Sequence, residues 1–171
     1  MAIYKGYILT REQFASGDKH RLRYSGISDH GPFEIIITHN RPLFFIHRDT
    51  SLPPKKFHCE RRKVNLTAFD GRPVDALYFN TQHLLYNARQ YYEAQGIQTF
   101  ETDIHPQERY LMERFIHGGI EFEGPCHARA GVVQFINPKI RKGDYTPLFS
   151  VLSLDISAGK AYEYRGCPDA G

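Results

Sequence analysis

The chain has 171 residues, of which 41% are hydrophobic and 24% are charged, and its formal net charge is +3. This composition supports one hydrophobic core of ordinary size and excludes an intrinsically disordered or low-complexity protein. The small positive charge permits an anionic partner without requiring one. Charged residues interrupt the N-terminal segment, and no later run approaches the roughly 20 apolar residues of a membrane span, so we expect a cytoplasmic protein without a membrane partner.

The first 79 residues are predicted to form short strands separated by turns. Residues 33–38 and 43–47 are too short and too rich in β-branched or aromatic residues for helices. From residue 64 to 68 apolar and polar residues alternate, Asp70-Gly71 follows, and residues 73–79 are again strand-like. This pattern predicts a β-hairpin with its turn at Asp70-Gly71.

Two helices are predicted in the middle of the chain. Over residues 81–95 apolar side chains recur every three or four positions, with Thr81 placed to cap the start and Gly96 to end the helix in the left-handed conformation. The second helix is expected over residues 106–117, with Gly118-Gly119 as its stop. The apolar stripe expected to face the core consists of Leu111, Met112, Phe115 and Ile116.

Further strands are predicted after the second helix, at residues 120–123 and 130–136. Residues 137–147 are polar, bounded by prolines and without periodicity, which is typical of a connector between domains. Residues 151–156 then read as a buried strand that begins a new unit. Because strands and helices do not alternate as in a doubly wound sheet, the expected fold class is α+β, with mainly antiparallel strands and two amphipathic helices.

Two segments resemble family B DNA polymerases. One runs from Asp103 to Ile116 (DIHPQERYLMERFI) and is closest to the bacterial DNA polymerase II branch; the other is Gly71-Arg72-Pro73-Val74, followed by Leu77-Tyr78-Phe79. The resemblance implies that residues 1–146 form the N-terminal domain and residues 147–171 the truncated start of a 3'–5' exonuclease domain.

The complete enzyme that the resemblance implies is a Mg²⁺-dependent DNA-directed DNA polymerase, a nucleotidyltransferase in DNA replication and repair synthesis. Its implied partners are template DNA, its own remaining domains and a sliding clamp bound through parts outside this chain. In the family the N-terminal domain borders the single-stranded template and helps to hold the other domains in place. This fragment alone is expected to be inactive and to need no cofactor, because both active sites require residues beyond Gly171.

The resemblance places Asp155 at the first exonuclease motif. In that motif an Asp and a Glu two residues later share one face of a strand and bind the same divalent metals. Here Ser157 stands where the pattern has Glu. A neutral hydroxyl does not replace a carboxylate as a ligand for Mg²⁺, so proofreading is not expected from this motif as it stands.

Contacts with DNA are predicted chiefly for the stretch from Pro53 to Lys63. It holds five Lys or Arg residues against one Glu, with Phe57 between them, which suits a phosphate backbone with one base stacked on the ring. The alternative interpretation is a solvated loop. The candidate DNA-binding residues are Lys55, Lys56, Phe57, Arg61, Arg62, Lys63, Arg109, Arg114, Lys139, Arg141 and Lys142.

Other interpretations stay open. Arg109 has Glu113 four residues away and could form an ion pair with it, or Arg109 and Arg114 could position the following domain. The chain could instead be a free-standing module that binds single-stranded nucleic acid, or a docking domain with an exposed apolar patch. His58-Cys59 and Cys126-His127 do not have the spacing of structural zinc ligands, and the three cysteines are expected to be reduced.

Overall fold

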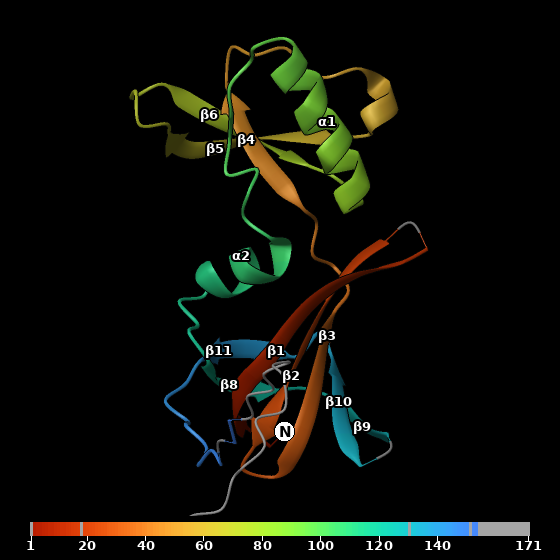
Figure 1. The fold of residues 1–171 in the computed structure, drawn as a ribbon, viewed down its shortest axis with the longest axis vertical. Coiled ribbons are helices and arrows are strands. Elements are labelled where there is room, and N and C mark those ends of the chain that lie inside the picture. The colour runs from red at the N-terminus through yellow and green to blue at the C-terminus, as the bar shows by residue number, and fades with distance from the viewer. Residues whose placement is uncertain (1, 18, 130, 151, 154–171) are drawn as a thin grey trace, which may run out of the picture.

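The computed structural model describes residues 2–17, 19–129, 131–150 and 152–153. These residues form a seven-stranded sheet and a four-stranded sheet, one above the other along the long axis of the molecule (Figure 1). Residues 43–100 build the four-stranded sheet with its helix and are inserted into the chain that builds the other sheet. The predicted α+β class with mainly antiparallel strands is confirmed.

The seven-stranded sheet has the order β11-β8-β1-β2-β3-β10-β9. Its strands are β1 (Tyr4–Ser16), β2 (Lys19–Ser28), β3 (Gly31–Ile37), β8 (Gly119–Glu123), β9 (Cys126–Arg129), β10 (Val132–Ile136) and β11 (Lys139–Lys142). All neighbours pair antiparallel except β3 and β10, which are parallel.

The four-stranded sheet has the order β5-β6-β4-β7. Its strands are β4 (Leu43–His47), β5 (Glu60–Thr67), β6 (Pro73–Tyr78) and β7 (Thr99–Phe100). The helices among the described residues are the short 3₁₀ helix η1 (Lys55–Phe57) and the α-helices α1 (Gln82–Ala94) and α2 (Pro106–Met112).

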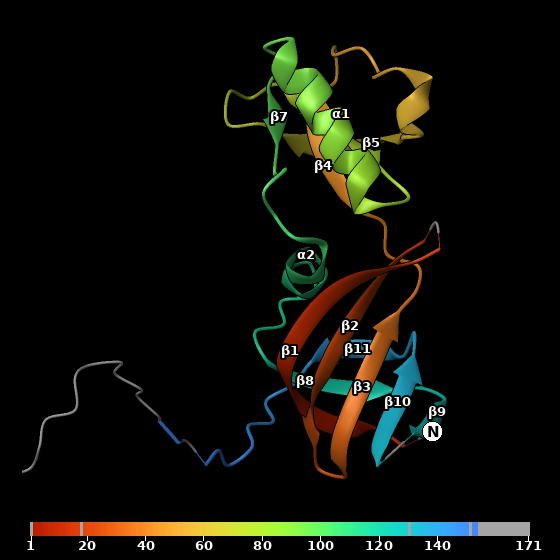
Figure 2. The ribbon, with the colours of Figure 1, turned by 45° about the vertical axis from the view of Figure 1, so that its right-hand side comes forward.

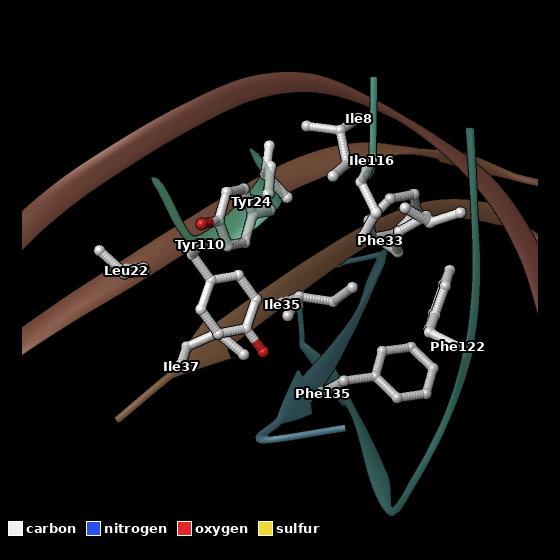
Figure 3. Packing of buried hydrophobic residues seen from close by; sticks show 12 residues of the cluster. Ile8, Leu22, Tyr24, Phe33, Ile35, Ile37, Tyr110, Ile116, Phe122 and Phe135 are labelled. Carbon is white, nitrogen blue, oxygen red and sulfur yellow. The ribbon is translucent and has the colours of Figure 1, made fainter. Parts of the chain in front are cut away.

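The seven-stranded sheet curls on itself so that distant strands share one core. The rings of Phe122 on β8 and Phe135 on β10 lie 4.9 Å apart although three strands separate β8 from β10 in the sheet order (Figure 3). Helix α2 adds the buried side chains of Tyr110 and Leu111 to this core. The hydroxyl of Tyr24 also donates a hydrogen bond of 2.9 Å to a backbone carbonyl of α2.

One face of the four-stranded sheet is covered by α1 (Figure 2). The hydroxyl of Thr81 accepts a hydrogen bond from the backbone N–H of Leu84, and Gly96 has φ +66, so both predicted ends of this helix are confirmed. The predicted hairpin is confirmed as well: β5 and β6 pair antiparallel, and Gly71 in their turn has φ +80.

The second helix is shorter than the sequence predicted. It ends at Met112, whose side chain is 59% exposed, and Phe115 is 76% exposed with φ +54. The predicted core stripe is therefore wrong for these two residues and right for Leu111 and Ile116, which are buried. The helix ends early because Phe115 adopts the left-handed conformation, which turns the chain out of the helical path.

The predicted strand boundaries need further corrections. The first strands are not all short, because β1 has 13 residues. Within the expected connector, residues 139–142 form β11 and pair with β8, and strand β9 was not predicted. Only residues 152 and 153 of the expected strand at residues 151–156 are described, and Asp155 and Ser157 lie outside the described residues, so the domain boundary at residue 146 stays a prediction.

Candidate nucleic-acid interface

No helix of the described residues packs on the second face of the four-stranded sheet, and we call it the open face. It is formed by Leu43, Phe45, Val74, Ala76, Tyr78 and Phe100. Side-chain alternation places these residues opposite α1, since Phe44, Ile46 and Leu77 pack beneath that helix. The first four of them are nevertheless buried. Arginine side chains lie over part of the face.

Two arginines lie against Tyr78 at the end of the open face nearest the seven-stranded sheet. The guanidinium carbon of Arg62 is 4.7 Å from the ring centre and that of Arg41 is 5.7 Å from it. Glu60 accepts a hydrogen bond from each arginine. The hydrogen bonds from Arg62 and Arg41 lower the pKa of Glu60 to about 2. Two positive charges thus share one carboxylate beside a half-buried ring.

Arg109 extends from α2 to the same face. Its guanidinium carbon lies 5.5 Å from the centre of the Phe45 ring, and its Nη1 lies 2.7 Å from a carboxylate oxygen of Glu101. The expected ion pair with Glu113 is therefore replaced by a pair with Glu101. Arg114 instead lies over the ring of Tyr110 at 3.7 Å.

On the α1 side of the sheet, Arg61 has a structural role. Its Nε lies 2.7 Å from Asp75, which Arg48 also contacts at 2.8 Å, and the Asp75 side chain is only 2% exposed. Burial by itself raises the pKa of Asp75, but the hydrogen bonds from Arg48 and Arg61 outweigh it and hold the pKa below its ordinary value. Arg61 thus stabilises the fold by pairing with a buried carboxylate.

The rest of the basic stretch also lies on the α1 side. Phe57 is buried beneath α1, 5.5 Å from Tyr91, so its ring is not exposed for a base to stack on. Lys55 and Lys56 are exposed on η1, and Lys63 is exposed on β5. The stretch is therefore no single loop, because residues 60–63 already belong to a strand.

The basic residues of β11 lie in the other sheet. Lys139 is 3.5 Å from Glu123, and Arg141 is 2.7 Å from Glu121. Together with Lys142 they lie in the other half of the molecule from η1, below α2 in both views of the ribbon (Figures 1 and 2). They do not extend the stretch around Lys55 into one continuous surface.

Neither a metal site nor a membrane span is found in the part of the chain that the structure describes. Cys59 precedes β5 and Cys126 lies on β9, in different halves of the molecule. No group of three or more His, Cys, Asp or Glu residues within the described ranges is placed to hold a metal ion. Likewise, no helix among these residues has the length and hydropathy needed to cross a membrane.

Comparisons of the sequence and of the fold with known proteins both find DNA polymerases. No protein-family model matches the sequence. The chain is 28% identical over 158 residues to DNA polymerase II of Escherichia coli (strain K12), an alignment that covers 88% of this chain and 20% of that protein. The family B DNA polymerase from the hyperthermophilic archaeon Pyrobaculum calidifontis shares the fold with a TM-score of 0.62 and 15% identity, over 84% of this chain and 21% of that chain.

The chain resembles the N-terminal region of family B DNA polymerases. It spans about a fifth of the length of each of these two relatives. The resemblance inferred from the second-helix segment and the Gly71 segment is thereby confirmed, and so is the fold.

Of the residues on the open face, the sequence predicted Arg62 and Arg109 as candidate DNA-binding residues, but that set of candidates did not include Arg41 or Tyr78. Arg41 lies before a proline between two strands, and Tyr78 lies in the Leu77-Tyr78-Phe79 segment at the end of a strand, but neither local sequence indicates that these two side chains meet. They come together because β4, β5 and β6 are neighbours in one sheet. The pairing of strands, rather than a motif, makes this cluster.

Proposed function

We propose that this chain forms the N-terminal domain of a family B DNA polymerase of the DNA polymerase II type, and that it contacts the single-stranded template through Arg41, Arg62 and Tyr78. The whole enzyme would be a DNA-directed nucleotidyltransferase that uses Mg²⁺ in replication and repair synthesis. Asp155 would belong to the metal site of its exonuclease domain. The similarity to DNA polymerase II supports the first part of the proposal.

The observation that carries the DNA contact is the pair of arginines beside the Tyr78 ring. Guanidinium groups bind phosphate in a bidentate geometry, and aromatic rings stack on bases of any sequence. Glu60 holds both guanidiniums in place but neutralises only one of their two charges. A template phosphate would therefore meet a preorganised site that keeps net positive charge.

A second role, as a scaffold for the other domains, is supported by a different surface. Met112 ends α2 and is 59% exposed, and Phe115, three residues later, is 76% exposed. Exposed apolar side chains that lie together are typical of surfaces covered by a partner. The remaining domains of the polymerase are the proposed partner of this end of α2.

Fluorescence anisotropy with a labelled single-stranded oligonucleotide and with a primer-template tests the DNA contact. Two variants that each remove two positive charges are compared: Arg41→Gln with Arg62→Gln on the open face, and Lys55→Gln with Lys56→Gln on the α1 side. We expect the first variant to weaken binding about tenfold or more and to reduce the salt dependence by about two phosphate contacts, while the second stays close to the unmodified chain.

If the Lys55 and Lys56 variant loses more DNA affinity than the Arg41 and Arg62 variant, the DNA contact lies on the α1 side of the sheet. If the chain binds no DNA at about 50 mM salt, it acts as a scaffold whose DNA contacts need other domains. Tyr78→Leu tests stacking without a change of charge and should weaken binding, whereas Tyr78→Phe should not. Circular dichroism of each variant separates a lost contact from a lost fold.

A further inference from the structure

The pair Gly118-Gly119 lies between α2 and β8 and does not end the helix, although the sequence predicted that role for it. Helix α2 ends at Met112, and Phe115 takes the left-handed position after it. Neither Gly118 nor Gly119 has a positive φ, so a left-handed conformation does not explain glycine at these positions. The reason for glycine here lies in the space around the two residues.

Both glycines are crowded by atoms from other parts of the chain. A Cβ on Gly118 would lie 2.6 Å from the ring of Tyr7, and a Cβ on Gly119 would lie 2.5 Å from the carbonyl oxygen of Gly143. The crowding is mutual, because a Cβ on Gly143 would lie 2.7 Å from the carbonyl carbon of Ile120. No side chain fits at any of the three glycines unless a ring or a stretch of backbone is displaced.

These close approaches hold the segment that follows β11, and we call residues 143–149 the strap. At its start, the N–H of Gly143 donates a hydrogen bond of 3.0 Å to the carbonyl of Gly119. Gly143, Tyr145 and Pro147 are half-buried, while the residues between them are exposed. An alternation with period two is typical of an extended chain that lies with one side on a surface. The strap thus lies along the domain over this length.

The other end of the strap is held by Tyr7 on β1. The ring of Phe149 packs edge-on against the ring of Tyr7, with 5.7 Å between the ring centres. The residue after Tyr7 is bound to the glycine pair, because the N–H of Ile8 donates a hydrogen bond of 2.9 Å to the carbonyl of Gly118. The ring of Tyr7 therefore contacts Gly118 and Phe149, and the strap is attached at both of its ends.

We propose that the strap has a fixed position and that the three glycines and Tyr7 form the clasp that fastens it. A polar segment bounded by prolines and without periodicity ordinarily acts as a tether between domains. The clasp instead makes the chain leave the domain from β1 in one direction, so that whatever follows the strap starts from a fixed point on the seven-stranded sheet. This inference goes beyond the proposed DNA contact and does not depend on it, because no residue of the clasp belongs to the cluster around Tyr78.

NMR spectroscopy of the full chain tests the proposal through amide hydrogen exchange and backbone order parameters. The N–H of Gly143 should exchange about tenfold or more slowly than in a synthetic peptide of residues 139–153, because it donates to Gly119. The order parameters of the strap should be about 0.85, as in a rigid backbone. Exchange at the rate of the peptide, or order parameters below about 0.6, would show a flexible tether and overturn the proposal.

Two pairs of variants test the clasp itself. Gly119→Ala should speed the exchange of the Gly143 N–H about tenfold or more. Gly71→Ala should leave that exchange unchanged, because a Cβ on Gly71 would meet nothing within 4 Å. Phe149→Ser should lower the order parameters of the strap, whereas Leu148→Ser should not, because Leu148 is fully exposed.

Equal effects of the two members of either pair would contradict the clasp. Circular dichroism shows whether each variant folds. If Gly119→Ala does not fold, the comparison of Phe149→Ser with Leu148→Ser decides alone, because both side chains lie at the surface and their loss leaves the core intact.

Discussion

The guanidinium carbon of Arg109 lies 5.5 Å from the centre of the Phe45 ring, and this contact joins the two halves of the molecule. Phe45 belongs to the open face of the four-stranded sheet. The two residues that follow Arg109 are buried in the core of the seven-stranded sheet. Helix α2 therefore packs its apolar side against the core of the seven-stranded sheet and contacts the four-stranded sheet through Arg109.

Replacing Arg109 should weaken the connection between the two halves. Arg109→Ala removes the contact with Phe45 and the ion pair with Glu101, both made by a side chain that is only 13% exposed. We expect the free energy of unfolding in urea to fall by about 1–2 kcal/mol. Arg89→Ala removes an exposed ion pair on α1 and should cost less than about 0.5 kcal/mol. Equal losses would contradict a special role for Arg109.

The buried Asp75 should make stability depend on pH. Asp75→Asn leaves Arg48 and Arg61 without their carboxylate and should lower the free energy of unfolding by about 3 kcal/mol at neutral pH. Because the pKa of Asp75 is lowered in the folded chain, its contribution is full above the unfolded pKa of about 3.9 and is lost as the pH falls through the folded pKa.

The check on Asp75 is a series of urea titrations of both proteins at decreasing pH. The difference between unmodified chain and variant should be constant near neutral pH and should shrink only below about pH 4. A difference that is the same at every pH would mean that the carboxylate acts through its shape and not through its charge.

Phe115 occupies a position where glycine is the usual residue. The N–H of Ile116 donates to the carbonyl of Leu111, and the N–H of Phe115 donates to that of Met112, both at 3.0 Å. The same pair of hydrogen bonds ends α1, where the left-handed residue is Gly96. Both helices thus end in a Schellman motif.

Phe115→Gly should consequently be more stable than Phe115→Ala by about 1 kcal/mol, since only glycine adopts φ +54 without steric cost. Comparing two variants that both lack the ring removes the effect of the exposed side chain. Thermal unfolding of the two proteins measures the difference. The reverse order would show that the left-handed conformation at this position is not strained.

Gly26 should tolerate no side chain. A Cβ there would lie 2.0 Å from the carbonyl oxygen of Tyr7 on the paired strand β1 and 2.7 Å from the ring of Phe33. Gly26→Ala should cost about 3 kcal/mol or more, because a backbone strand has to move. At Gly71, where φ is +80 and a Cβ would meet nothing within 4 Å, the change to Ala should cost only about 1 kcal/mol. Urea denaturation compares the two.

The elements that the sequence predicted well are those specified by neighbouring residues. The hairpin follows from alternation on both sides of Asp70-Gly71, and α1 follows from its apolar period between Thr81 and Gly96. The strand β11 was missed because an exposed edge strand needs few apolar residues and its sequence therefore resembles a connector. The end of α2 was missed because a phenylalanine, not the glycine pair that follows, takes the left-handed position.

Local sequence patterns specify α1 and the β5–β6 hairpin, and the second-helix segment carries the resemblance to family B polymerases. Which side chains meet depends on how the strands pair in space. Strand β3 pairs in parallel with β10 about 100 residues later, and Arg41 reaches Tyr78 across the sheet. Such contacts depend on strand order and register, which a single sequence does not record, because each strand can pair with many others until the core selects one arrangement. The exposure of Phe69 and the burial of Phe57 were decided in the same way.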